Sequence, residues 1–243
     1  MKKSGQLKKT QGIEWPVLIT GTLIKRYKRF LADVRLADGR VVTAHCPNSG
    51  TMKACSTPGR PVYLSFHDNP KRKLKYTWEI IQMPDSLVGV NTLIPNKLVK
   101  HSIEANRVSE LANYDQVVSE IKVSPGARLD LLLKKQTGEN CFVEVKNCTL
   151  VEDGAACFPD AVTDRGHKHL LELQRLVAEG NRCAMFYLIQ RMDAKQFKPA
   201  DHIDPDYGRE LRKAHGHGVE IFVYDVIIDL KRIRLNQKVP FVL

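Results

Sequence analysis

The chain has 243 residues, of which 43% are hydrophobic and 27% are charged, and its formal net charge is +11. A chain of this length and composition buries a sizeable core, which excludes a disordered or collagen-like protein. The positive charge is unevenly distributed: residues 1–90 hold 16 Lys and Arg against 6 Asp and Glu, whereas residues 91–243 hold 22 against 21.

This asymmetry indicates two domains, the first with a surface suited to a polyanion. Lysine and arginine side chains that neutralise phosphates gain affinity by releasing counterions, so nucleic acid is one partner that fits this chemistry. An anionic membrane and an acidic protein are the other candidates. A well-solvated basic surface is the alternative that needs no partner.

The predicted compartment is the cytoplasm. No apolar run approaches the roughly 20 residues needed to cross a bilayer, and no apolar segment follows the basic start of the chain as it does in a signal peptide. The 6 cysteines include no Cys-x-x-Cys pair and several lie in apolar runs. We therefore expect buried thiols rather than disulfides or a structural zinc site.

Residues 13–90 are predicted to form a small closed β-barrel of the OB type, with an SH3-like barrel as the alternative. Short segments of strand composition alternate with turn signals such as Ala37-Asp38-Gly39 and Thr57-Pro58-Gly59. Five short strands without a convincing helix are typical of such barrels. The predicted strands are 17–24, 30–36, 40–45, 61–66 and 76–82.

Two basic clusters in this first part are predicted to bind nucleic acid. Cations that flank strands can follow a phosphate backbone, and aromatic rings between them can stack on bases. For the aromatic residues we favour burial in the core instead, and these are Tyr27, Phe30, Tyr76 and Trp78. The predicted nucleic-acid-binding cations are Lys25, Arg26, Lys28, Arg29, Lys71, Arg72, Lys73 and Lys75.

Residues 91–243 are predicted to form an α/β domain with a mixed sheet. The apolar segments 182–189 and 219–228 are typical of strands buried on both faces. No disordered linker separates the two parts, so we expect the domains to pack against each other. The predicted elements are helical segments at 93–101 and 114–118, strands at 120–123, 128–133 and 141–146, a helix at 164–179, a strand at 182–189, a helix at 206–214 and a strand at 219–228.

The best candidate for chemistry is a charged pair on the apolar strand 141–146. Glu144 and Lys146 are two residues apart and therefore project from the same face of the strand. If the preceding hairpin has an odd-length loop centred on Thr137, Asp130 lies opposite Glu144 on that face. A two-residue turn would shift the register and separate the two carboxylates.

Two carboxylates beside a lysine are suited to a Mg²⁺ or Mn²⁺ site. Asp130 and Glu144 would hold the metal, and one of its waters would attack a phosphodiester. Lys146 would orient that water or offset charge at the scissile phosphate. The Glu-x-Lys motif alone is weak, because a second copy begins at Glu120, and a structural ion pair explains it equally well.

The chain resembles the sugar fermentation stimulation protein family over nearly its whole length. The similarity is carried by segments 23–34, 45–52, 90–92 and 158–166. Segment 45–52 reads His-Cys-Pro-Asn-Ser-Gly-Thr-Met, and segment 158–166 reads Phe-Pro-Asp-Ala-Val-Thr-Asp-Arg-Gly.

The resemblance implies an N-terminal OB-fold domain, followed by a domain similar to the PD-(D/E)XK nuclease superfamily. The core pattern of that superfamily maps onto Asp130, Glu144 and Lys146. Many members add a glutamate from an earlier element, for which Glu120 and Glu110 are the candidates. The resemblance also implies a non-specific DNA-binding protein linked to the regulation of sugar use, particularly of maltose.

The predicted helix 164–179 places Arg165 and Lys168 on a polar stripe, and both are predicted to contact nucleic acid. The helix N-terminus carries a partial positive charge that could face a phosphate. The alternative for both residues is an ordinary amphipathic helix with a solvated face.

Two functions from different classes are consistent with these patterns. The leading hypothesis is a cytoplasmic protein that binds double- or single-stranded DNA without sequence preference and presents a nuclease-like cleft. The alternative is a Mg²⁺- or Mn²⁺-dependent endonuclease whose catalytic residues are Asp130, Glu144, Lys146 and Glu120. RNA is a further possible partner, because OB barrels accept both polymers.

Overall fold

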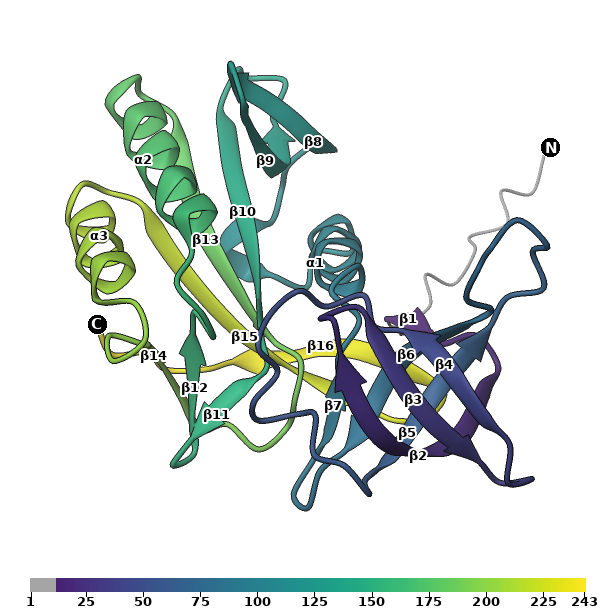
Figure 1. The fold of residues 1–243 in the computed structure, drawn as a ribbon. Helices are drawn as coiled ribbons and strands as arrows, with labels where there is room; N and C mark the ends of the chain where they lie inside the picture. The colour runs from purple at the N-terminus through teal and green to yellow at the C-terminus, as the bar shows by residue number, and fades with distance from the viewer. Residues whose placement is uncertain (1–11) are drawn as a thin grey trace, which may run out of the picture.

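The computed structural model describes residues 12–243 and confirms the predicted fold class, a small closed barrel followed by a mixed-sheet α/β domain (Figure 1). The basic segment at residues 1–11, which contributes to the charge asymmetry, lies outside the described residues. No helix within residues 12–243 is long and apolar enough to span a membrane. All six cysteines are buried free thiols, as expected.

The barrel is a five-stranded closed sheet with one further strand at its edge. Its strands follow the order β4-β3-β2-β5-β6-β7, and a parallel pairing of β4 with β6 closes the sheet. The strands are β2 (Leu18–Tyr27), β3 (Leu31–Leu36), β4 (Val41–His45), β5 (Pro61–Phe66), β6 (Tyr76–Gln82) and β7 (Leu87–Gly89).

The barrel interior is filled by the inward-facing side chains of these strands, because side chains alternate between the two faces of a strand. Trp78 is completely buried there, as predicted, and its Nε1 donates to the carbonyl of Ile80 at 3.0 Å. Phe30 is 49% exposed, so its predicted burial is wrong. The reason is local: Phe30 lies in the turn between β2 and β3, which projects from the barrel.

The α/β domain is built on a seven-stranded sheet of order β1-β16-β15-β13-β10-β9-β8, with β10, β13 and β15 parallel. A second, small sheet has the order β11-β12-β14. The large sheet contains β1 (Ile13–Glu14), β8 (Gln116–Ser124), β9 (Ala127–Lys134), β10 (Asn140–Cys148), β13 (Arg182–Ile189), β15 (Glu220–Ile228) and β16 (Arg232–Lys238). The small sheet contains β11 (Leu150–Glu152), β12 (Ala155–Phe158) and β14 (Gln196–Pro199).

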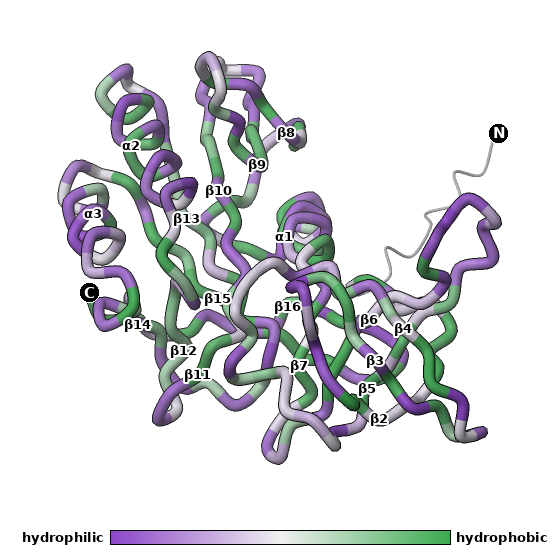
Figure 2. The backbone as a smooth tube through the Cα atoms, in the orientation of Figure 1, coloured by the Kyte–Doolittle hydropathy of each residue, from purple (hydrophilic) through white to green (hydrophobic). Residues whose placement is uncertain are grey.

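Helices cover both faces of the large sheet. Helix α1 (Ile94–Glu104) packs on one face in a core that also includes Tyr63 and Ile80 of the barrel. Helices α2 (Asp164–Ala178) and α3 (Pro205–Gly216) pack on the other face. Figure 2 shows the central strands as largely hydrophobic, whereas the long loop between β5 and β6 is strongly hydrophilic.

The predicted helical segment at 114–118 is wrong, because Gln116 already begins β8. This segment contains two consecutive valines, and pairing with β9 satisfies its backbone as an edge strand of the sheet. The start of the predicted barrel at residue 13 also needs correction. Strand β1 pairs with β16, Ile13 with Ile233, and therefore belongs to the large sheet rather than to the barrel. The division near residue 90 stays a prediction.

The two domains pack against each other, as expected. Besides the shared core, Gly89 N donates to the Gln190 carbonyl at 2.9 Å. Thr51 Oγ1 donates to the carbonyl of Asp160 at 3.0 Å. Backbone and side chains of both domains thus share hydrogen bonds across the contact.

Candidate functional site

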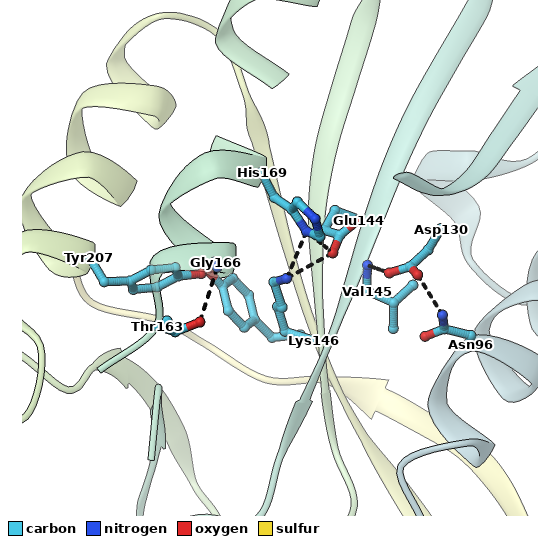
Figure 3. A network of polar contacts seen from close by, with 10 residues as sticks. Asn96, Asp130, Glu144, Val145, Lys146, Thr163, Gly166, His169 and Tyr207 are labelled. Carbon is cyan, nitrogen blue, oxygen red and sulfur yellow. Dashed lines mark hydrogen bonds and ion pairs between the residues drawn. The ribbon is translucent and has the colours of Figure 1, made fainter. Parts of the chain in front are cut away.

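The structure brings Glu144, Lys146 and His169 together in one buried group, which we call the Glu144 cluster (Figure 3). Glu144 and Lys146 project from β10 toward α2, which carries His169. Lys146 Nζ donates to Glu144 Oε1 at 2.7 Å and lies 3.1 Å from His169 Nδ1, which also contacts Glu144 Oε1. The Glu144 side chain is only 3% exposed, so these charges interact away from bulk water.

The Glu144 carboxylate is ionised but incompletely satisfied. Burial acts to raise its pKa, but the charge of Lys146 and the hydrogen bond with His169 outweigh burial and hold the pKa below its ordinary value. Its second oxygen, Oε2, is buried without a hydrogen-bond partner among the described residues. Such an atom is costly in a folded protein, so this position is suited to a further positively charged group.

Asp130 on β9 is the second predicted carboxylate, and the hairpin register brings it to β10. Val143 pairs with Leu131, which is the register of an odd-length loop centred on Thr137. The next pair in this register is Asp130 with Glu144. The observed pairing ends at Val143 with Leu131, so the register is the predicted one, while a site shared by the two carboxylates stays a prediction.

Asp130 is held by two hydrogen bonds. Its Oδ1 accepts from Asn96 Nδ2 of α1 at 2.6 Å, and its Oδ2 accepts from Val145 N at 2.8 Å. Burial and the negative charge of Glu144 raise the pKa of Asp130 to about 6, although the two hydrogen bonds act in the opposite direction. The pair of carboxylates thus carries electrostatic repulsion that a cation would relieve.

The two carboxylates fit a hard divalent cation. Mg²⁺ and Mn²⁺ take carboxylate oxygens together with water. Glu144 offers the unpartnered Oε2, and each oxygen of Asp130 has a lone pair beyond its one hydrogen bond. Residues 12–243 contain no group of three or more His, Cys, Asp and Glu side chains arranged for a metal ion. Water would therefore complete the coordination of a cation held by these two residues.

Neither additional glutamate that the resemblance implies joins the Glu144 cluster. Glu120 is exposed on β8 and pairs with Arg128 at 3.0 Å. Glu110 accepts hydrogen bonds from Lys238 Nζ at 2.7 Å and from Tyr224 Oη at 2.8 Å. Burial acts to raise the pKa of Glu110, but these hydrogen bonds lower it to about 2. Both glutamates are therefore engaged in ion pairs elsewhere, and a catalytic role for Glu120 stays a prediction.

His169 and Asn96 belong to the site but were not predicted from the sequence. His169 lies on the buried face of α2 together with Gly166, Leu170 and Leu173. A histidine within an apolar helical stripe is the signal that could have identified it, because such a side chain needs a polar partner inside the protein. Asn96 has no comparable signal, since a partly exposed asparagine in a helix is common.

Arg165 and Lys168 line an open groove of about 910 Å³ between α2 and the turn that joins β8 to β9. The groove is also lined by Lys122, Arg128, Asp164 and Glu172, so its charged lining carries a net positive charge. His169 also lines this groove, and because His169 contacts Glu144, the groove adjoins the Glu144 cluster. The structure therefore brings Arg165 and Lys168, but not the barrel cations, next to the candidate metal ligands.

The first barrel cluster lies in and beside the turn between β2 and β3. Arg26 is directed inward, and its guanidinium donates to the carbonyls of Asn48 and Gly50, both at 2.8 Å, and of Arg29 and Thr51, both at 3.1 Å. Its structural role is to hold segment 48–51. Of the other cations in this cluster, Lys25 lies 3.8 Å from Asp33 and over the Tyr27 ring, whereas Lys28 and Arg29 form the exposed turn.

The second barrel cluster occupies the loop between β5 and β6, which lies at the far edge of the barrel from the α/β domain (Figure 1). Lys71 and Lys73 are exposed, Arg72 donates to Thr77 Oγ1 at 3.0 Å, and Lys75 lies 3.5 Å from Asp68. The two clusters are therefore separate surfaces. Nucleic-acid binding by either cluster stays a prediction.

Both parts of the chain match known protein families. The family described as sugar fermentation stimulation protein RE domain matches residues 93–232, and the SfsA N-terminal OB domain matches residues 24–90. A sugar fermentation stimulation protein homolog of Geobacter sulfurreducens is 52% identical over 223 residues, covering 92% of this chain and 95% of the relative. The homolog of Pelobacter propionicus is 51% identical over 228 residues, covering 94% and 99%.

A solved structure has the same fold over almost the whole chain. The structure of Pyrococcus furiosus SfsA in complex with Ca²⁺ matches with a TM-score of 0.87 and 26% sequence identity, covering 96% of this chain and 99% of the other. Both domains therefore have counterparts in one relative. From these matches over both domains, the protein belongs to the sugar fermentation stimulation protein family.

Proposed function

We propose that this protein binds DNA without sequence preference and hydrolyses phosphodiester bonds in it at the Glu144 cluster, with Mg²⁺ or Mn²⁺ as cofactor. The observation that carries the proposal is the buried Oε2 of Glu144, which has no hydrogen-bond partner among the described residues. The charge of the same carboxylate helps to raise the pKa of Asp130. A fold that keeps two repelling carboxylates and an unsatisfied oxygen together gives up stability, and functional sites are where such costs concentrate.

The proposed chemistry divides among the residues of the cluster. When bound by Glu144 and Asp130, the divalent cation supplies an activated water and neutralises charge on the phosphate. Lys146 Nζ, held by Glu144 Oε1, has further donors with which to orient that water or stabilise a phosphate oxygen. His169 positions Lys146 and Glu144 through its contacts with both. Asn96 and Val145 N fix the orientation of Asp130.

Nucleic acid is the substrate class that best fits the surroundings. The groove lined by Arg165 and Lys168 leads to His169, and its cations can contact successive phosphates without reading bases. The barrel cations would add backbone affinity. The Pyrococcus furiosus relative was solved in complex with Ca²⁺, which supports a site for a hard cation, because Ca²⁺ takes the same oxygen ligands as Mg²⁺.

The test is a cleavage assay with single- and double-stranded DNA and with RNA, in Mg²⁺, in Mn²⁺ and in EDTA. Glu144→Gln and Asp130→Asn should reduce metal-dependent cleavage by more than the roughly 10- to 100-fold typical of losing an outer-shell partner. Glu79→Gln is the matched control, because Glu79 is equally buried but lies in the barrel, bonded to Ser65 and Asn91. Cleavage that is absent in every metal, or that survives both site variants, contradicts the enzymatic proposal.

The second candidate function is sequence-independent DNA binding without hydrolysis, as part of the regulation of sugar or maltose use in the cytoplasm. It is favoured by the exposed cations Lys28, Arg29, Lys71 and Lys73, none of which lines the groove that His169 reaches. Affinity should then fall steeply with salt and differ little between DNA sequences. Salt-independent affinity, or a strongly preferred operator, would argue against it.

A further inference from the structure

A pocket of about 440 Å³ lies where the barrel meets the α/β domain. The barrel contributes Arg26, Arg29 and segment 48–51, and the α/β domain contributes the end of β10 and segment 157–163, which leads into α2. All four sequence segments through which the chain resembles its family therefore contribute to the pocket. The mechanism proposed above assigns no role to them.

The walls of this pocket are fixed from both domains. Arg26 holds segment 48–51 through hydrogen bonds to three of its carbonyls. From the other side, Asp160 accepts from Thr51 Oγ1 at 3.3 Å and from Met52 N at 3.2 Å. Gly50 permits this approach, because a Cβ at that position would lie 2.4 Å from Asp160 Oδ2. A pocket with walls tied together in this way can bind a ligand at a low cost in conformational entropy.

Besides Arg26 and Asp160, which are engaged in the hydrogen bonds described above, the lining combines one cation without an ion pair, Arg29, with neutral hydrogen-bonding groups and apolar surface. Arg29 is exposed at the pocket and forms no ion pair among the described residues. Lys28 and Arg29, in the turn between β2 and β3, have φ values of 48° and 63°. This left-handed backbone conformation is unfavourable for residues with a Cβ. Asn147 and Thr149 supply amide and hydroxyl groups, and Phe158 supplies an apolar ring.

These features match a single nucleotide. Arg29 can bind a phosphate, the amide and hydroxyl groups can bind sugar and base edges, and the apolar lining can cover a base. The volume is within the range of small-ligand pockets, about 300–1,000 Å³, and a base pair within a duplex could not enter it.

The pocket also adjoins the Glu144 cluster. Asn147 follows Lys146 directly on β10. Thr163 lines the pocket and caps α2, its Oγ1 accepting from Gly166 N at 3.0 Å, and the same helix carries His169 (Figure 3). The basic groove with Arg165 and Lys168 lies at the same end of α2. The groove and the pocket adjoin at Asp164 and Thr163, so a strand that follows the groove past His169 would reach the pocket next.

We infer that the pocket between the domains holds one unpaired nucleotide of the substrate strand, next to the Glu144 cluster. This inference rests on the proposed function for its substrate and specifies it: the preferred substrate is a single strand or a frayed end rather than an intact duplex. The phosphate of the bound nucleotide contacts Arg29.

The test measures binding in EDTA, where cleavage does not contribute. A short fluorescein-labelled oligothymidylate is titrated against the protein, with unlabelled duplex DNA and adenosine monophosphate as competitors. Arg29→Ala and Ser49→Trp address the pocket, the second by filling it from an exposed position. Arg35→Ala is the matched control, since it removes an exposed arginine that lies outside the pocket.

We expect the oligonucleotide to bind more tightly than the duplex and to be displaced by adenosine monophosphate. Arg29→Ala should weaken binding about tenfold, as expected for the loss of one charge-assisted contact, and Arg35→Ala should change it less than twofold. Ser49→Trp should weaken binding at least as much as Arg29→Ala, because the indole ring occupies the space of the nucleotide. Arg29→Ala should also lower the salt slope by about one. Thermal unfolding verifies that all variants are folded.

Equal effects of Arg29→Ala and Arg35→Ala, or unchanged affinity in Ser49→Trp, would overturn the inference. Failure of adenosine monophosphate to displace the oligonucleotide, or displacement by duplex DNA alone, would also contradict the inference. The proposed hydrolysis and the proposed pocket can be refuted independently of each other. Loss of cleavage in every metal with intact pocket binding refutes the enzyme but not the pocket, and cleavage of single strands unaffected by Ser49→Trp refutes the pocket but not the enzyme.

Discussion

Replacing Asp130 by Asn should stabilise the metal-free protein at about pH 8. The Asp130 pKa is raised from 3.8 to about 6 by burial and by the charge of Glu144. Above pH 6 the side chain is ionised in both the folded and the unfolded state, so the folded state carries the full cost of the shift. A shift of about two units corresponds to about 3 kcal/mol, which is an upper limit because solvent reaches part of the side chain.

The sign of the pH dependence follows from the raised pKa. Well below pH 3.8 Asp130 is protonated in both states and contributes no penalty, and the penalty develops as the pH rises through the interval between 3.8 and about 6. The Asn side chain retains an oxygen that can accept from Val145 N, and its amide can bond Asn96 if that side chain turns over. The variant should therefore gain about 1–3 kcal/mol at pH 8 and little at pH 4.

Urea unfolding in EDTA at both pH values measures this difference. Asp153→Asn, in the exposed turn between β11 and β12, is the control and should change stability by less than about 0.5 kcal/mol. Adding Mg²⁺ at 100 times its Kd should stabilise the wild type by about 2.7 kcal/mol and the variant by less. The stability advantage of the variant over the wild type should therefore disappear or reverse. A stability difference that is the same at pH 4 and pH 8 would refute the assignment of the raised pKa to Asp130.

Three further predictions concern the fold. Gly50→Ala should cost about 1–3 kcal/mol in urea unfolding, because its Cβ would meet Asp160, whereas Gly216→Ala, with no atom within 4 Å, should be close to neutral. Trp78→Ala should lower stability by about 3–5 kcal/mol, because this side chain is fully buried, and Phe30→Ala by less than about 0.5 kcal/mol, because Phe30 is half exposed. Equal losses of stability in thermal unfolding would contradict the assignment of Trp78 to the barrel core. Thr163→Ala should cost about 1 kcal/mol through loss of the α2 cap, and Thr163→Ser should restore most of it; calorimetry that finds no difference between the two rules out the cap.

The sequence predicted the regular elements well where a local pattern determines them. Strands 61–66, 76–82 and 182–189 are found at the predicted bounds, and the helix predicted at 164–179 is observed at Asp164–Ala178. Alternating or continuous apolar residues and a threonine cap were sufficient signals in these segments. The five strands of the barrel were recognised for the same reason.

Elements that depend on distant partners were missed. Strands β11, β12 and β14 contain three or four residues each, and their backbones are satisfied by one another rather than by any local pattern. The site shows the same limit. Hairpin symmetry predicted the register that brings Asp130 toward Glu144. His169 reaches Glu144 only because α2 packs over the neighbouring strands β9 and β13, and Glu120 pairs with Arg128 instead.

The pairing of β1 with β16 has a consequence for synthesis on the ribosome. Trp15 is buried with its backbone N donating to the Lys231 carbonyl and its Nε1 donating to the Asp229 carbonyl, both at 2.9 Å. These acceptors are translated more than 200 residues after Trp15. A nascent chain can therefore close its barrel early, while the indole ring of Trp15 stays exposed to water until Asp229 and Lys231 have been synthesised and β16 can form.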